Sequence, residues 1–293
     1  DPSQIVDSNM ETTLFNIRLP RILAVLLVGG GLSIAGAAYQ GMFKNPMVSP
    51  DILGASAGAG FGACLAMLME LPTVYVQMFS FCGGILAVFI AATATRRFSM
   101  DPILGLVLGG MMVSTLFQSG TSTIKILADA DNKLPQITFW LMGSFNVMNK
   151  AKLFSILIPI GAGFLILFLV RWQLNVLSFG EDEASSLGIK TKRIRSMVII
   201  ASTLITASCV SVCGMVGWVG LVIPHAGRAL AGPDYRRLLP VCAILGSTFL
   251  LLVDDVARTA FMVELPIGIL TSFIGVPFFM FIFKSGVNKG GSA

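Results

Sequence analysis

The stretch SMVIIASTLITASCVSVCGMVGWVGLVIPHAG, residues 196–227, contains no Asp, Glu, Lys or Arg, and it decides how the chain is arranged. A helix needs about 20 apolar residues to cross a bilayer. The 32 residues of this stretch are therefore too many for one ordinary span and few for two. Gly214 and Gly217 lie in its middle, where a tight turn can fall. The stretch predicts either one long span or two helices joined at these glycines.

The composition places this stretch in a membrane protein. Charged residues make up 12% of the chain and hydrophobic residues 55%, whereas soluble domains carry about 25% charged residues. Uncharged runs recur along the chain, at residues 22–43, 52–69, 71–95, 103–124, 153–170, 196–227, 238–253 and 265–283. We therefore expect residues 1–293 to form one all-α transmembrane domain, a polytopic helical bundle.

The distribution of Lys and Arg decides between one helix and two in residues 196–227. With two helices, nine spans and the N-terminus outside, the inner loops hold 13 basic residues and the outer loops 7. With one helix the count becomes 9 inside and 11 outside, which contradicts the excess of basic residues expected in cytoplasmic loops. We therefore expect nine spans. An odd count that begins outside also suggests one further helix before Asp1.

Several classes of function are disfavoured by what the sequence lacks. It contains no G-x-x-x-x-G-K-[ST] phosphate loop, so we expect this chain not to hydrolyse ATP. It contains three Tyr and no interleaving of basic and aromatic residues, which argues against nucleic-acid binding. All five cysteines lie inside apolar runs, and neither His nor a carboxylate neighbours the Cys209–Cys213 pair. We interpret them as buried small hydrophobic residues and expect no metal site.

Ionisable residues are scarce in the middle of the predicted spans. Secondary transporters coupled to protons or ions carry carboxylates, His or Lys near the bilayer midplane. In this chain Asp254, Asp255, Arg258 and Glu264 lie together at one outer helix boundary instead. The pattern favours transport driven from elsewhere over a secondary transporter or channel. An intramembrane hydrolase is a weaker alternative, because the single histidine, His225, lies at an inner helix end.

The polar segment LSFGEDEASSLGIKTKRIR, residues 177–195, is predicted to form an inner loop that contains a short helix. Gly180 suits a turn, and the acidic run 181–183 suits the first turn of a helix, where it faces the positive end of the helix dipole. Gly188 suits the position after that helix, and Thr191 the cap of the next span. Such a helix fits a docking element, with a solvated connector as the alternative.

Five stretches together resemble one family of proteins. They are IRLPRILAVLLVGGGLSIAGAAYQGMFKNPMVSPDILGASAGAG, FWLMGS, SFGEDEASSLG, GWVGLVIPHAGRALAGPDYRRLLP and ELPIGILTSFIGVPFF, in family order over residues 17–283. They are similar to the permease subunits of the bacterial type II ABC importers, which take up iron chelates, haem, cobalamin and, in some members, molybdate. An iron–siderophore complex or haem is the expected substrate, and molybdate or tungstate and cobalamin are the alternatives.

The resemblance implies a permease of ten helices, of which this chain lacks the first, in the bacterial inner membrane. It implies a homodimer around a central pathway, two cytoplasmic ATPase subunits that bind ATP and Mg²⁺, and a periplasmic substrate-binding protein. The chain itself would carry no catalytic residue and no cofactor. It would move its ligand to the cytoplasm by alternating access.

The resemblance also implies roles for individual residues at the outer side. The family's outer arginines, which pair with glutamates of the binding protein, correspond here to Arg18, Arg21 and Arg258. The predicted topology places all three outside, where each can be fully exposed. Anchoring at the membrane interface is the alternative role for them.

At the inner side the resemblance implies a coupling surface and a gate. The ATPase-coupling loop matches Gly180, Glu181, Ala184, Leu187 and Gly188. His225 and Arg228 would lie beside the ATPase as structural or coupling residues. The inner gate would correspond to Ser99, Met100, Asp101 and Pro102, although SMDP does not reproduce the Thr-Ser pair of the cobalamin member.

Overall fold

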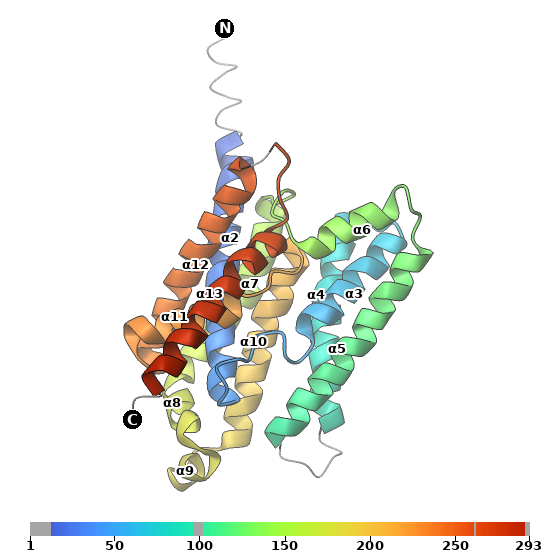
Figure 1. Cartoon of the computed structure of the whole chain (residues 1–293). Coiled ribbons are helices and arrows are strands. Elements are labelled where there is room, and N and C mark those ends of the chain that lie inside the picture. The colour runs from blue at the N-terminus through green and yellow to red at the C-terminus, as the bar shows by residue number, and fades with distance from the viewer. Residues whose placement is uncertain (1–12, 96–101, 261, 291–293) are drawn as a thin grey trace.

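The computed structural model describes residues 13–95, 102–260 and 262–290, which fold almost entirely into helices (Figure 1). The long helices are α2 (Leu19–Met42), α4 (Thr73–Thr95), α5 (Pro102–Leu127), α7 (Lys150–Leu169), α10 (Thr191–Cys213), α12 (Tyr235–Thr259) and α13 (Ile267–Gly290). The shorter ones are η1 (Leu14–Arg18), α3 (Ala55–Leu68), α6 (Lys133–Met142), α8 (Arg171–Phe179), α9 (Glu181–Ser186) and α11 (Val219–Ala231). The predicted all-α class is confirmed for these residues.

Within the described ranges, six helical segments are long and apolar enough to cross a membrane. They are Leu14–Met42, Thr73–Ala94, Pro102–Leu127, Lys150–Leu169, Thr191–Cys213 and Tyr235–Thr259. Three shorter apolar helices, α3, α11 and the Ile267–Met280 part of α13, lie where the sequence predicts three further spans. The six long segments make the chain a multi-pass membrane protein.

The apolar stretch 196–227 is divided into two helices, as its glycines predict. α10 ends at Cys213 and α11 begins at Val219. Gly214 has φ +72° and Trp218 has φ +68°, both in the left-handed region that takes the chain out of a right-handed helix. The alternative of one long span is therefore wrong.

Hydrogen bonds join the end of α10 to the segment after α6, and that segment to the start of α13. Lipid offers no partners for backbone N–H and C=O groups, so non-helical segments must find them within the protein. The N–H of Ser144, after α6, donates to the carbonyl of Cys213 over 2.8 Å. The N–H of Ile267, at the start of α13, donates to the carbonyl of Gly143 over 2.9 Å. We call this meeting point the three-helix junction (residues 143–144, 213–218 and 266–268).

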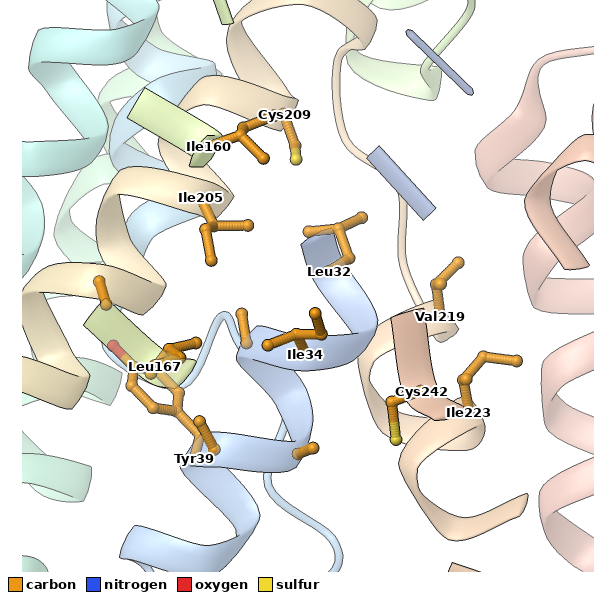
Figure 2. Packing of buried hydrophobic residues seen from close by; sticks show 14 of the residues in the cluster. Leu32, Ile34, Tyr39, Ile160, Leu167, Ile205, Cys209, Val219, Ile223 and Cys242 are labelled. Carbon is orange, nitrogen blue, oxygen red and sulfur yellow. The ribbon is translucent and has the colours of Figure 1, made fainter. Parts of the chain in front are cut away.

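Helix α2 forms the centre of the larger of two groups of helices. Every residue from Val28 to Met42 is buried, because α7, α10, α11 and α12 surround this helix. Figure 2 shows side chains of α2 between those of α7 and α10 on one side and those of α11 on the other. The contact with α11 is very close: a Cβ atom added at Gly36 would lie 1.8 Å from the carbonyl oxygen of Gly220.

The second group consists of α3, α4, α5 and α6, which lie together on the right of Figure 1. Glycines of α3 face the backbone of α4 here. A Cβ atom added at Gly58 would lie 2.3 Å from the carbonyl oxygen of Gly83, and one at Gly62 would lie 2.1 Å from that of Phe79. The small-residue spacing of α3 therefore serves close helix packing, as in other membrane helices.

Four local features differ from the sequence-based expectations. Helices α6 and α8 are not predicted, because at 10 and 9 residues they are too short to produce an apolar run of spanning length. Thr191 is the first residue of α10, and Lys190 takes the N-cap position instead. Cys82 of α4 is exposed, whereas the other four cysteines are buried as expected.

The contact between α2 and α11 gives a first prediction. Gly36→Ala is expected to lower the free energy of unfolding by about 1–3 kcal/mol, because the methyl group overlaps a carbonyl oxygen. Gly161→Ala in α7 is the matched control, since a Cβ atom there meets nothing within 4 Å. Thermal unfolding of both variants in detergent measures the effect. Equal midpoints for the two variants would contradict the proposed overlap.

Candidate functional site

Charged residues join α2, α12 and the segment before α13 at the end of the bundle that the sequence predicts to be outside. The carboxylate of Asp254, whose side chain is 1% exposed, accepts hydrogen bonds from Arg21 Nη2 at 2.7 Å and Arg21 Nε at 3.0 Å. Arg21 Nη2 also pairs with Glu264, and Nη1 donates to Asn146 Oδ1 over 3.3 Å. Arg21 thus has acceptors on three separate segments of the chain.

Arg258 shares Asp254 with Arg21. It lies one turn further along α12, where its Nε is 3.5 Å from Asp254 Oδ2 and its Nη2 pairs with Asp255. We call Arg21, Asp254, Asp255, Arg258 and Glu264 the outer charge cluster. Asp254 is its one fully buried member, and two guanidinium groups compensate the cost of burying its carboxylate.

The three outer arginines differ in exposure. Arg18 is exposed on η1, and the side chain of Arg258 is 33% exposed. The side chain of Arg21 is only 11% exposed, so Arg21 does not have the full exposure that the predicted topology allows. The physical reason is its pairing with Asp254, which lies 233 positions away in the sequence.

The inner loop forms α8 and α9 at the opposite end of the bundle, at the bottom of Figure 1. The predicted short helix is present, since α9 begins at Glu181 directly after Gly180. Gly188 has φ +77° and ends this segment, as predicted. Ala184 is fully buried and holds α9 against the bundle, whereas Leu187 is 65% exposed. An exposed apolar side chain beside a short helix can contact a partner protein.

Asn175 of α8 attaches this loop to the start of α12. Its Nδ2 donates to Asp234 Oδ1 over 2.5 Å, and its Oδ1 accepts from the N–H of Tyr235 over 2.7 Å. Asp234 caps α12 by accepting from the N–H of Arg236 at 2.9 Å. That bond first, and then the bond from Asn175, hold the pKa of the Asp234 carboxyl below its usual value.

Sequence reasoning missed both Asn175 and Asp234. The signal for Asp234 was available, because an aspartate directly after Gly232-Pro233 and before a helix is a typical N-cap. Nothing near Asn175 in the sequence indicates its partner, which lies 59 positions further on.

His225 and Arg228, the two residues of α11 expected beside the ATPase, differ from each other in their surroundings. His225 is half-buried on α11. Arg228 turns towards α2, where its Nη1 donates to Gln40 Oε1 over 2.5 Å. Gln40 Nε2 in turn donates to the carbonyls of Leu221 at 3.2 Å and Val48 at 3.3 Å. Arg228 therefore fastens α11 to the inner end of α2.

Three of the expected gate residues, Ser99, Met100 and Asp101, lie outside the described residues. Pro102 is the first residue of α5 and is exposed. Proline suits this position, because the first N–H of a helix has no intrahelical partner.

A cleft of about 690 Å³ opens beside the three-helix junction. Its walls come from the end of α6, from the linker before α11 and from α13, and they include Leu141, Met142, Met215, Ile269, Ser272 and Phe273. None of the residues lining it is ionisable. The cleft can therefore accommodate a ligand without holding it by charge.

Comparison with known proteins identifies the family. The family model for the FecCD transport family matches residues 2–285. The molybdate import system permease protein MolB of Haemophilus influenzae is 40% identical over 289 residues, 98% of this chain and 85% of that protein. A probable iron chelatin transport system permease protein of Helicobacter pylori strain 26695 is 37% identical, over 94% of this chain and 83% of that protein. The cobalamin import system permease protein BtuC of Halobacterium salinarum is 36% identical, over 95% and 75%.

A solved structure agrees with these relatives. A metal-chelate type ABC transporter in an inward-facing conformation matches with a TM-score of 0.90 and 38% identity, over 97% of this chain and 89% of that chain. PsaBC from Streptococcus pneumoniae has the same fold, with a TM-score of 0.66 and 16% identity over 95% of each chain. The family match, the relatives and this structure together show that the chain belongs to the FecCD transport family, as a permease of an ABC importer.

Proposed function

We propose that this chain carries a metal chelate, an iron–siderophore complex or haem, from a periplasmic binding protein to the cytoplasm by alternating access. Two copies of the chain form the permease in the bacterial inner membrane, and two ATPase subunits drive it. The strongest support for this function is the position of the charged and polar groups at the two ends of the bundle. The outer charge cluster lies at one end of the bundle and α8–α9 at the other, and the cleft at the three-helix junction has no ionisable lining.

The proposal includes nine crossings of the membrane. α3 and α11 have 14 and 13 residues, and at about 1.5 Å per residue they are shorter than the roughly 30 Å of the hydrocarbon core. The non-helical segments beside them complete these two crossings. Such segments are tolerated at membrane depth where they are buried in protein or line a cavity. The linker before α11 meets the second condition, since it contributes Met215 and Gly217 to the cleft.

Each end of the bundle has its own partner in this proposal. Arg18 and Arg258 receive acidic residues of the binding protein, because both are exposed at the outer end. Leu187 and His225 contact the ATPase at the inner end. The cleft offers a ligand few specific contacts, so recognition of the substrate is left to the binding protein.

Similarity to a molybdate permease supports a second candidate substrate. Identity to the molybdate permease MolB is 40% over nearly the whole chain, compared with 37% to the iron chelatin permease. Molybdate or tungstate is therefore the alternative cargo, followed by cobalamin. A small oxyanion needs no charged residue in the permease, because backbone N–H groups can serve it.

Uptake into proteoliposomes tests the function directly. The permease is reconstituted with its ATPase and binding protein, and each of labelled ferric siderophore, haem, cobalamin and molybdate is offered in turn. We expect ATP-dependent uptake of one ligand that requires all three components. Uptake without the ATPase or the binding protein would instead show a secondary transporter.

The attachment of α8 to α12 gives a prediction for energy coupling. Asn175→Ala removes both hydrogen bonds to the start of α12, so the inner loop no longer moves with that helix. We expect uptake to fall several-fold while ATP hydrolysis by the assembled complex is retained. Ser178→Ala, at an exposed position on the same helix, removes only a hydroxyl bond to the main-chain carbonyl of Asn175 and leaves both side-chain bonds of Asn175 in place. It is the control and should leave both rates unchanged. Parallel loss of both rates in Asn175→Ala would point to failed assembly instead.

The cleft gives a separate prediction for passage. Ser272→Trp fills the cleft from α13, so we expect most of the uptake to be lost while the binding protein still docks and ATP is still hydrolysed. Leu252→Trp places the same side chain at a 61% exposed position on α12 and should retain uptake. Normal uptake by Ser272→Trp would show that the ligand passes elsewhere.

A further inference from the structure

We infer that Asp254 is a positioning residue for docking: it holds Arg258 in place at the outer surface and keeps Arg21 turned away from it. This inference rests on the proposed function, in which Arg18 and Arg258 receive acidic residues of the binding protein. It assigns a role to a carboxylate that the docking partner itself does not contact.

The burial of Asp254 is the first support. Its side chain is 1% exposed, and a buried carboxylate is costly unless charged partners compensate it. Both partners are arginines of the predicted docking set. Asp254 Oδ2 accepts from Arg21 Nε at 3.0 Å and lies 3.5 Å from Arg258 Nε. One carboxylate therefore fixes two side chains that come from different helices.

The position of Arg21 is the second support. Asp254, Glu264 and Asn146 surround its guanidinium group from α12, the segment before α13 and the segment after α6. With 11% of its side chain exposed, Arg21 has little surface to offer to a partner. It ties α2 to α12 instead, behind the two exposed arginines.

The neighbouring Asp255 shows what is particular to Asp254. The two carboxylates are adjacent in sequence and carry the same charge. The side chain of Asp255 is 51% exposed, and its carboxylate is closer to Arg258 than that of Asp254 is. An ion pair at so exposed a site contributes little to holding a side chain in place. In a purely electrostatic account, removing either negative charge strengthens the attraction of an acidic partner to this surface. If Asp254 positions the arginines, its removal weakens docking although the surface becomes more positive.

The affinity of the binding protein for the assembled permease–ATPase complex in nanodiscs tests this difference in sign. We expect Asp254→Asn to weaken docking about fivefold or more, Asp255→Asn not to weaken it, and Asp254→Glu to recover part of the loss. Asp254→Asn is also expected to cost little in a background that already carries Arg258→Ala, because the two residues act through one contact. Asp254→Asn docking as tightly as the unchanged complex, or more tightly, would overturn the inference.

Further variants separate this inference from the proposed function. Arg18→Ala and Arg258→Ala remove the docking groups themselves, so unchanged affinity in both would refute docking at this surface altogether. Weaker docking in these two variants, with normal docking in Asp254→Asn, would refute the positioning role alone.

A variant of Arg21 keeps the inference testable if Asp254→Asn does not fold. Arg21→Gln leaves Asp254 paired with Arg258, and we expect a lower thermal midpoint with a smaller loss of docking affinity than in Arg258→Ala. Equal losses of affinity in Arg21→Gln and Arg258→Ala would show that Arg21 contacts the binding protein directly, and would overturn the inference.

Discussion

The structure depends on one constraint: inside a bilayer every backbone N–H and C=O group needs a partner within the protein. Helices meet this requirement by themselves, but the chain breaks its helices at Gly143, Gly214 and Pro266. These breaks come together and share hydrogen bonds, from Ser144 to Cys213 and from Ile267 to Gly143. The three-helix junction is therefore what allows non-helical backbone, and with it an open cleft, to exist beside the packed helices.

The same constraint explains where the charges lie. A charged side chain within the hydrocarbon is costly, so in the described part of the chain the ion pairs of the spanning helices lie at the outer end. Asp254 is the most demanding case, since it is fully buried and is compensated by two arginines. A permease that leaves recognition to one partner and energy to another needs charge at its two surfaces and little of it between them.

The features that could be predicted from the sequence are those set by neighbouring residues. The break at Gly214 and the helix after Gly180 follow from local glycine and acidic patterns, and both are present. The arginine–carboxylate pairing was not predictable, because Arg21 and Asp254 are 233 positions apart and nothing in one segment indicates the other. Helices α6 and α8 were not predicted, because a hydropathy pattern detects apolar runs of spanning length and these helices have only 10 and 9 residues. The burial of Arg21 was not predictable for the same reason, because its acceptors come from distant segments of the chain. Arg18, three residues earlier, is exposed.

The contact of Gly36 with Gly220 has a mechanical consequence. A Cβ atom at Gly36 would lie 1.8 Å from the carbonyl oxygen of Gly220, so backbone meets backbone here without an intervening side chain. Side chains between two helices can change rotamer when one helix shifts, whereas backbone atoms in direct contact cannot rearrange in this way. We therefore expect helices α2 and α11 to move together. We expect the hinges of this protein at other helix–helix contacts, where longer side chains separate the two backbones.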